Sequence, residues 1–217
     1  IKMFSKFKLL IILTSFILVV SCSNKDKKIS EIVELDIELQ MSNAYREGYL
    51  EFEKGEAIAA AKKFNEAELL FPQSPWAAKS AIMAAYVYYS QGYYGDAAYE
   101  IERYLTTYPN HKDKPYAHFL LGMTFYETIV DEKKDLRSIL DSKKQFEIII
   151  KEYPTTEFAI DAKFKIDLIT EILAGKEMYL ARYYLDRSKW IPALNRYKKV
   201  IDEYSTTIYA EEALHRL

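Results

Sequence analysis

Cys22 is the residue whose surroundings point most directly to chemistry. Three lysines within the first eight residues precede an apolar run over residues 9–20, and Val19-Val20-Ser21 stands directly before the cysteine. A basic region, a short apolar core and a small residue before the cut are typical of a secretory signal peptide. With a cysteine in the next position, the pattern is that of a bacterial lipoprotein signal, in which the thiol takes a diacylglycerol and cleavage makes that cysteine the N-terminus.

A lipid anchor follows from this pattern. We expect residues 1–21 to be removed and Cys22 to carry an S-diacylglycerol and an N-acyl group, with no other cofactor. Three acyl chains hold a protein to a membrane far more firmly than one. Ser23 stands where aspartate favours retention in the inner membrane of many Gram-negative cells, which indicates the periplasmic face of the outer membrane. Residues 22–39 then form the lipidated N-terminus and a polar tether. The alternative is an ordinary signal peptide with an incidental cysteine.

Residues for catalysis are sparse. His111, His118 and His215 are scattered, and none is paired at the HExxH spacing of a helical zinc site. The chain has no GxSxG motif and no glycine-rich phosphate loop. After residue 21 there are 27 basic and 32 acidic residues, a balance of about minus five that does not suit nucleic acid. The sequence therefore predicts neither an enzyme nor a metal site.

One spacing recurs four times after the tether and indicates how the chain folds. A small residue is followed by a bulkier one four positions on, by another residue three further on, and by a helix-ending residue five after that. Such positions share one helix face, and proline cannot continue a helix. The four copies are Ala60-Phe64-Ala67-Pro72, Ala97-Ile101-Tyr104-Pro109, Ser142-Phe146-Ile149-Pro154 and Ala193-Tyr197-Val200-Ser205.

A first helix precedes each of these copies. Gly48, Ala85 and Ala181 lie twelve residues before the small residue of their own copy, so each unit reads as a helical hairpin. The first two prolines are 37 residues apart, close to the period of about 34 residues in tetratricopeptide repeats. We predict an all-α, tetratricopeptide-like helical-hairpin solenoid of about four to five repeats, the last one truncated. The N-terminal repeats are expected over residues 40–127 and the C-terminal repeats over residues 128–217.

Two departures from the period are expected to be structural. About eight extra residues lie near 129–138, and their charged run, 131–135, predicts a solvated loop rather than a dedicated contact site. No proline interrupts residues 158–186, where small and apolar residues keep a helical rhythm. This segment is predicted to be one long helix, with a bend at Gly175.

Aromatic residues give the best candidate for a binding surface. In tetratricopeptide arrays the first helix of each hairpin lines the concave face, and tyrosines there offer apolar area together with a hydroxyl for an extended peptide. The alternative is that these rings only pack between hairpins. The positions that point into such a groove are Tyr45, Tyr49 and Phe52; Ile82, Tyr86 and Tyr89; and Phe119, Met123 and Tyr126.

The signal, the cysteine and the repeats together resemble one family closely. The most specific stretches are Ala174-x-x-Glu177-x-x-x-Ala181-x-Tyr183-Tyr184 and Trp190-x-x-Ala193-x-Asn195-Arg196. Further matches are Tyr45-x-x-Gly48 and the unit that ends in Tyr108-Pro109. These motifs resemble the BamD family, also called ComL or YfiO, the lipoproteins of the outer-membrane β-barrel assembly machinery. Ser205 departs from the family, which usually has proline there.

The resemblance implies a scaffold and a receptor. BamD-like proteins hold the periplasmic domains of BamA and other subunits of the assembly complex through their C-terminal repeats, and they bind unfolded outer-membrane proteins near the N-terminal repeats. The family's arginine at the BamA contact corresponds to Arg196, whose guanidinium suits a partner carboxylate. The client site would fall on Tyr45, Tyr49, Phe52, Tyr86, Tyr89, Phe119 and Tyr126. The alternatives are a pilotin-like lipoprotein that escorts a secretin and a cell-wall scaffold or hydrolase regulator.

Overall fold

The computed structural model describes residues 36–129 and 136–217. Cys22, the signal peptide, most of the tether and the charged run at 131–135 lie outside the described residues. Within them the regular structure is helical throughout, which confirms the all-α prediction. The helices are α2 (Ile37–Glu53), α3 (Ala57–Leu70), α4 (Pro75–Ser90), α5 (Tyr94–Thr107), α6 (Lys114–Glu127), α7 (Arg137–Glu152), α8 (Glu157–Leu185), α9 (Trp190–Glu203) and α10 (Ala210–Arg216).

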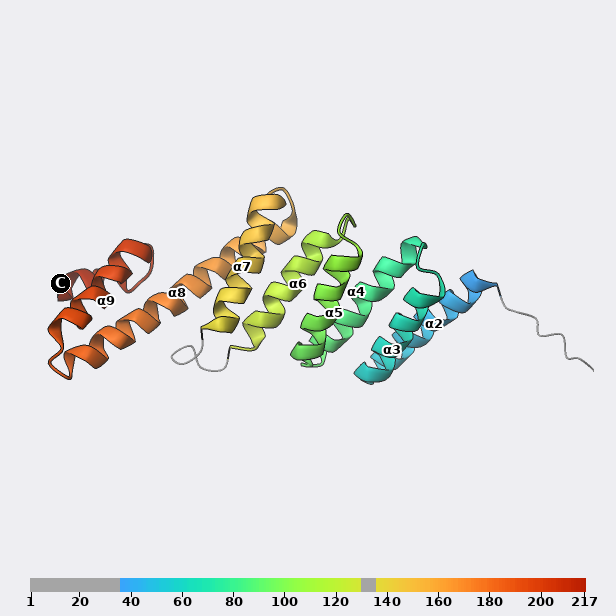
Figure 1. Cartoon of the computed structure of the whole chain (residues 1–217), viewed down its shortest axis with the longest axis horizontal. Coiled ribbons are helices and arrows are strands. Elements are labelled where there is room, and N and C mark those ends of the chain that lie inside the picture. The colour runs from blue at the N-terminus through green and yellow to red at the C-terminus, as the bar shows by residue number, and fades with distance from the viewer. Residues whose placement is uncertain (1–35, 130–135) are drawn as a thin grey trace, which may run out of the picture. The chain divides into compact units, whose positions relative to one another are not determined.

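Within residues 36–217 each helix packs chiefly against the next one along the chain (Figure 1). The pairs α2/α3, α4/α5, α6/α7 and α8/α9 are hairpins, as the solenoid prediction requires. The first helix begins at Ile37, three residues before the expected start of the repeats, and the Asp36 side chain accepts a hydrogen bond from the Glu38 N–H at its N-terminus. None of the helices in residues 36–129 and 136–217 has the length and apolar character needed to cross a membrane.

The recurring spacing of the sequence marks the core. The first three residues of every copy are buried, each at most 2% exposed. The fourth residue stands two positions beyond the last residue of α3, α5, α7 and α9. Ser205 does so without being a proline, and α9 still ends at Glu203. The small residues allow close approach, and the larger ones fill the space between helices.

Two glycines on first helices leave room for a ring of the second helix of the same hairpin. A Cβ atom at Gly48 would lie 3.1 Å from the Phe64 ring, and one at Gly122 would lie 2.7 Å from the Phe146 ring. The Ser142 hydroxyl donates to the Gly122 carbonyl at 2.8 Å. Each bulky residue of the second helix therefore packs onto the backbone of the first.

The long helix α8 packs chiefly against two other helices, α7 and α9. Its N-terminal half packs with Ile139 and Phe146 of α7, and its C-terminal half packs with α9 around Ala193. The helix continues without a break through Gly175. A Cβ atom at this position would lie 3.2 Å from the Tyr209 hydroxyl, so the absence of a side chain leaves room for Tyr209. Near the insert, Ser138 lies within α7 and not in the expected loop, since that helix begins at Arg137.

Candidate functional site

Aromatic side chains on the first helices contact one another from one hairpin to the next. On α2, the Tyr49 and Phe52 rings meet edge to face with centroids 6.4 Å apart, and Phe52 meets Tyr86 of α4 at 5.9 Å. Tyr49 is 47% exposed, whereas Phe52 and Tyr86 are half-buried. The predicted residues of the first two hairpins therefore form one group of rings, and Tyr49 gives this group an exposed edge.

Tyr45 lies deeper, beside a hollow near the N-terminal half of α2. Its ring packs edge to face against Phe64 at 5.1 Å and against Trp76 at 5.5 Å. The hollow has a volume of about 640 Å³, and Tyr45, Arg46 and Trp76 are among the residues that line it. The Lys79 ammonium lies 4.6 Å from the centre of the Trp76 ring, a cation–π contact. The hollow therefore has aromatic walls, and its charged lining residues are Arg46 and Glu38.

The ring contacts continue toward α6 and α8. Burial and, to a smaller extent, the neighbouring hydroxyls of Tyr86 and Tyr89 together raise the pKa of Tyr116 to about 12. Tyr116 and Phe119 each lie 5.6 Å from Phe158, at the start of α8. Sequence reasoning missed Tyr116 and Phe158, because it considered only fixed positions of the first three hairpins. Their aromatic type was the available signal.

The predicted residues of α6 differ in their surroundings. Phe119 also contacts the buried Phe146 ring at 5.7 Å, so it is largely a packing residue. The Lys165 ammonium lies 4.7 Å from the centre of the Tyr126 ring, a cation–π contact. Ile82 is buried at 5% exposure and faces the core. We call the following set the first-helix surface: Tyr45, Tyr49, Phe52, Tyr86, Tyr89, Tyr116, Phe119, Tyr126 and Phe158.

Arg196 already has a partner within the chain. Its Nη1 donates to Glu177 Oε2 at 2.8 Å, and the Lys199 ammonium donates to Oε1 of the same carboxylate at 2.8 Å. Glu177 is buried, with its side chain 7% exposed, whereas the side chain of Arg196 is 37% exposed. Burial raises the pKa of Glu177, but the two bonded cations outweigh it, and the net pKa lies below its usual value. The Arg196 guanidinium is thus held against α8 and remains partly open to solvent.

The partner of Arg196 follows the repeat register. Glu177 lies four residues before the small Ala181, and Arg196 lies three after Ala193. In the preceding hairpin the same two positions hold His118 and Gln145, and the His118 Nδ1 lies 2.9 Å from Gln145 Oε1. The last two hairpins therefore use the same two positions for a polar contact between their helices.

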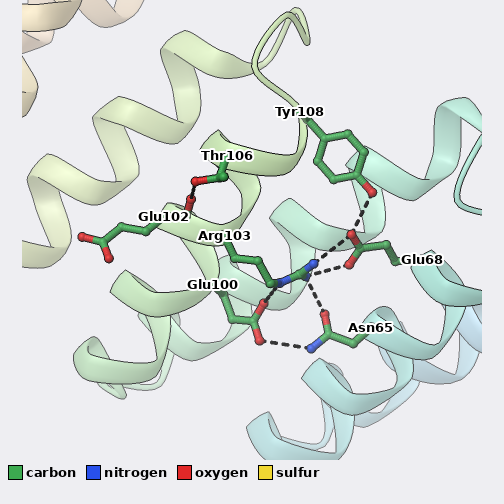
Figure 2. A network of polar contacts seen from close by, with 7 residues as sticks. All are labelled: Asn65, Glu68, Glu100, Glu102, Arg103, Thr106 and Tyr108. Carbon is green, nitrogen blue, oxygen red and sulfur yellow. Dashed lines mark hydrogen bonds and ion pairs between the residues drawn. The ribbon is translucent and has the colours of Figure 1, made fainter.

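A second polar cluster joins α3 to α5 (Figure 2). Arg103 donates to both oxygens of Glu68, from Nη1 at 2.9 Å and from Nη2 at 2.6 Å, and its Nε donates to Glu100 at 2.9 Å. Asn65 donates to Glu100 at 3.2 Å, and the Tyr108 hydroxyl donates to Glu68 at 2.7 Å. Sequence analysis did not anticipate this cluster, because its members are 35 to 40 residues apart on two different hairpins.

Two histidines of the described residues, His111 and His118, take part in local structure. The His111 Nδ1 lies 2.8 Å from the Tyr104 hydroxyl, and His118 is buried beside Gln145. No group of three or more His, Cys, Asp or Glu side chains in the part of the chain that the structure describes could hold a metal ion.

The arrangement defines a class: a tetratricopeptide-like array with an aromatic surface along its first helices. The family model of YfiO, an outer membrane lipoprotein, matches residues 37–217. The chain belongs to this family. Membership confirms the resemblance to BamD, a family of non-enzymatic assembly factors, and the expected class of outer membrane lipoprotein.

Three curated relatives illustrate the similarity, and each is named outer membrane protein assembly factor BamD. The protein of Caulobacter vibrioides is 33% identical over 199 residues, which cover 92% of this chain and 64% of the relative. That of Rickettsia prowazekii is 34% identical over 182 residues, 84% of this chain and 72% of the relative. That of Neisseria gonorrhoeae is 28% identical over 202 residues, with coverage of 88% and 73%. The chain therefore matches just under two thirds of the length of the Caulobacter relative.

Proposed function

We propose that this protein is a non-enzymatic assembly factor for outer-membrane β-barrel proteins, anchored at the periplasmic face of the outer membrane by lipids on Cys22. The observation that carries the proposal is the first-helix surface, in which rings of α2 and α4 contact each other, rings of α6 and α8 contact each other, and Tyr86, Tyr89 and Tyr116 pack against one shared core cluster. This surface binds segments of unfolded outer-membrane proteins. The names of the relatives favour this function over the alternatives of a secretin pilotin or a cell-wall scaffold.

The chemistry of the first-helix surface suits an extended aromatic peptide. Rings give large apolar contact at a small cost in side-chain entropy, and tyrosine hydroxyls can bond the peptide backbone. Beside Tyr45, the hollow lined by Arg46 suits a peptide whose last residue is aromatic, because the terminal carboxylate could pair with this guanidinium. The N-terminal repeats, residues 40–127, therefore act as the client site.

The C-terminal repeats, residues 128–217, act as the scaffold contact for BamA and other subunits of the assembly complex. Arg196 is the residue proposed to touch the partner. A guanidinium has five N–H groups, so the bond to Glu177 leaves donors for a second carboxylate. Because Glu177 and α8 already fix the side chain, little further entropy is lost when a partner binds.

Co-purification tests the proposal. The tagged, lipidated protein is isolated from its own envelope after mild crosslinking, and the accompanying proteins are identified. BamA and nascent β-barrel proteins are expected. A secretin or cell-wall enzymes in their place would contradict the assembly function while leaving the anchored scaffold intact. A matched control replaces Tyr99, an exposed tyrosine of α5 outside the first-helix surface, by alanine and should recover the same set of proteins.

A further inference from the structure

The first two hairpins meet through three kinds of contact. In the middle, Phe64 and Ala61 of α3 pack with Ala84 and Val87 of α4, and all four are buried. On the first helices, Phe52 of α2 meets the Tyr86 ring of α4. On the second helices, α3 and α5 are joined by the polar cluster of Figure 2. We call this cluster the α3–α5 clamp; its members are Asn65, Glu68, Glu100, Arg103 and Tyr108.

The buried α3–α4 contact does not by itself fix the angle between the hairpins. Its fully buried residues from α4, Ala84 and Val87, are apolar, as are Met83 and most of the Tyr88 ring around them, and apolar attraction is not directional. If one hairpin turned about this contact, the first helices and the second helices would separate or collide. The ring contacts of the first helices, Phe52–Tyr86 and Tyr45–Trp76, resist such a turn, and so does the clamp. Only the clamp consists of hydrogen bonds and ion pairs.

The clamp has a narrow geometry. Both Nη atoms of Arg103 bond both oxygens of Glu68, an arrangement that holds only when the two planar groups are nearly coplanar. The side chains of Glu68 and Glu100 are only 7% and 10% exposed, so water does little to replace a lost bond. In Figure 2 the Glu68 and Asn65 side chains extend from α3 toward Arg103 on α5, and Tyr108 approaches Glu68 from beyond the end of α5.

We infer that Arg103 is a positioning residue, which sets the angle between the first two hairpins through the α3–α5 clamp and so keeps Phe52 against Tyr86 on the other helices. The consequence for client binding rests on the proposed function. The consequence for the packing of the hairpins does not.

Trp76 reports on this packing. It begins α4, and its ring lies 5.5 Å from Tyr45 of α2, so its fluorescence depends on how the two hairpins meet. The other tryptophan, Trp190, lies on α9 and is replaced by phenylalanine in every sample. The full lipidated chain is studied in detergent, and helicity and unfolding midpoint are recorded for each variant.

The principal variant removes the clamp without leaving an unpaired buried charge: Glu68→Gln, Glu100→Gln and Arg103→Met together. Changing all three residues together avoids the large cost of leaving one buried charge without its partner. Arg103→Lys is the second variant, since it keeps the charge and loses the bidentate geometry. The matched control is Lys63→Met, which breaks ion pairs of Lys63 to Glu47 and Glu66 inside the first hairpin.

Both clamp variants should shift Trp76 emission to the red and make it more accessible to a neutral quencher, whereas Lys63→Met should not. Affinity for a peptide with the last ten residues of an outer-membrane protein should fall about three- to tenfold in both clamp variants. A folded triple variant with unchanged Trp76 emission overturns the inference, and shifted emission with unchanged peptide affinity overturns its consequence for client binding. If the peptide does not bind the parent protein, the client site fails, and the emission of the triple variant still decides whether the clamp sets the hairpin angle.

Discussion

The Phe52 ring of α2 lies edge-on to the Tyr86 ring of α4, with centroids 5.9 Å apart, although the two residues belong to different hairpins. Each ring also contacts its own hairpin's core. The side chains of this surface are therefore partly buried in the core and partly exposed. Its shape depends on how the hairpins stack, which links the fold of the array to the proposed binding of clients.

Close packing inside the third hairpin predicts that alanine at Gly122 destabilises the protein, whereas alanine at Gly95 does not. Gly122→Ala would place a Cβ atom 2.7 Å from the buried Phe146 ring, and the chain must shift to accept it. We expect a loss of about 1–3 kcal/mol in the free energy of unfolding. Chemical denaturation followed by circular dichroism measures it.

Gly95→Ala is the matched control for this change. Gly95 lies in the first turn of α5, and nothing lies within 4 Å of a Cβ atom there. Since alanine favours a helix over glycine by about 0.5–1 kcal/mol, this variant should be as stable as the parent or more so. Equal losses at the two glycines would contradict the packing described for Gly122.

Removal of the Glu177 charge should lower the stability of the fold and also release the Arg196 side chain from its fixed position. In Glu177→Gln, Arg196 and Lys199 lose their shared carboxylate, but both cations remain partly in water. The expected loss in the free energy of unfolding is therefore only about 1 kcal/mol. Partner binding should weaken through the loss of a fixed Arg196, measured by co-purification of BamA.

The control for this prediction is Arg196→Gln, since Glu177 then keeps Lys199. Reversal to Arg196→Glu is a poor test, because it would set a second carboxylate beside buried Glu177 and disturb the fold as well as the contact. If Arg196→Gln retains BamA fully in a folded protein, Arg196 is not the contact residue.

His118 predicts a pH dependence of stability. Burial lowers its pKa below 6.5, and the nearby Lys114 lowers it further, despite the opposing hydrogen bond to Gln145. Because the unfolded chain then binds the proton more readily, this residue's contribution is complete above about pH 6.5 and is lost as the pH falls toward the lowered folded value. The slope cannot exceed about 1.4 kcal/mol per pH unit.

Urea unfolding at pH 7.5, 6.5 and 5.5 measures this contribution. His118→Gln keeps a polar side chain without a titrating ring and should flatten the change over this range. An identical pH profile in the variant and the parent would show that His118 does not titrate with unfolding.

The hairpins could be predicted from sequence because their contacts repeat at fixed spacing. Phe64 and Phe146 are recognisable as core residues from the small residue four positions before each, and the structure buries both completely. Helix ends were predictable from Pro72, Pro109 and Pro154. The end of α9 was predictable only from its position in the repeat, because Ser205, unlike proline, does not prevent a helix from continuing.

The polar contacts were not predicted, because a charged residue on a helix gives no sign of which helix faces it. Arg103 and Glu68 are 35 residues apart, and only the stacking of two hairpins brings them together. Arg196 was expected to reach a partner, and the structure gives it Glu177 as well.

Binding of a client peptide to the first-helix surface tests the central claim most directly. The peptide has the ten C-terminal residues of an outer-membrane protein and ends in phenylalanine, and its affinity for the full chain is measured by fluorescence anisotropy. Tyr49→Ala with Tyr86→Ala should weaken binding at least about tenfold with helicity unchanged, because each lost ring contributes about 1 kcal/mol or more. The exposed Tyr99→Ala should bind as the parent does. Equal affinity of the double variant and the parent would contradict the assignment of this surface to client binding.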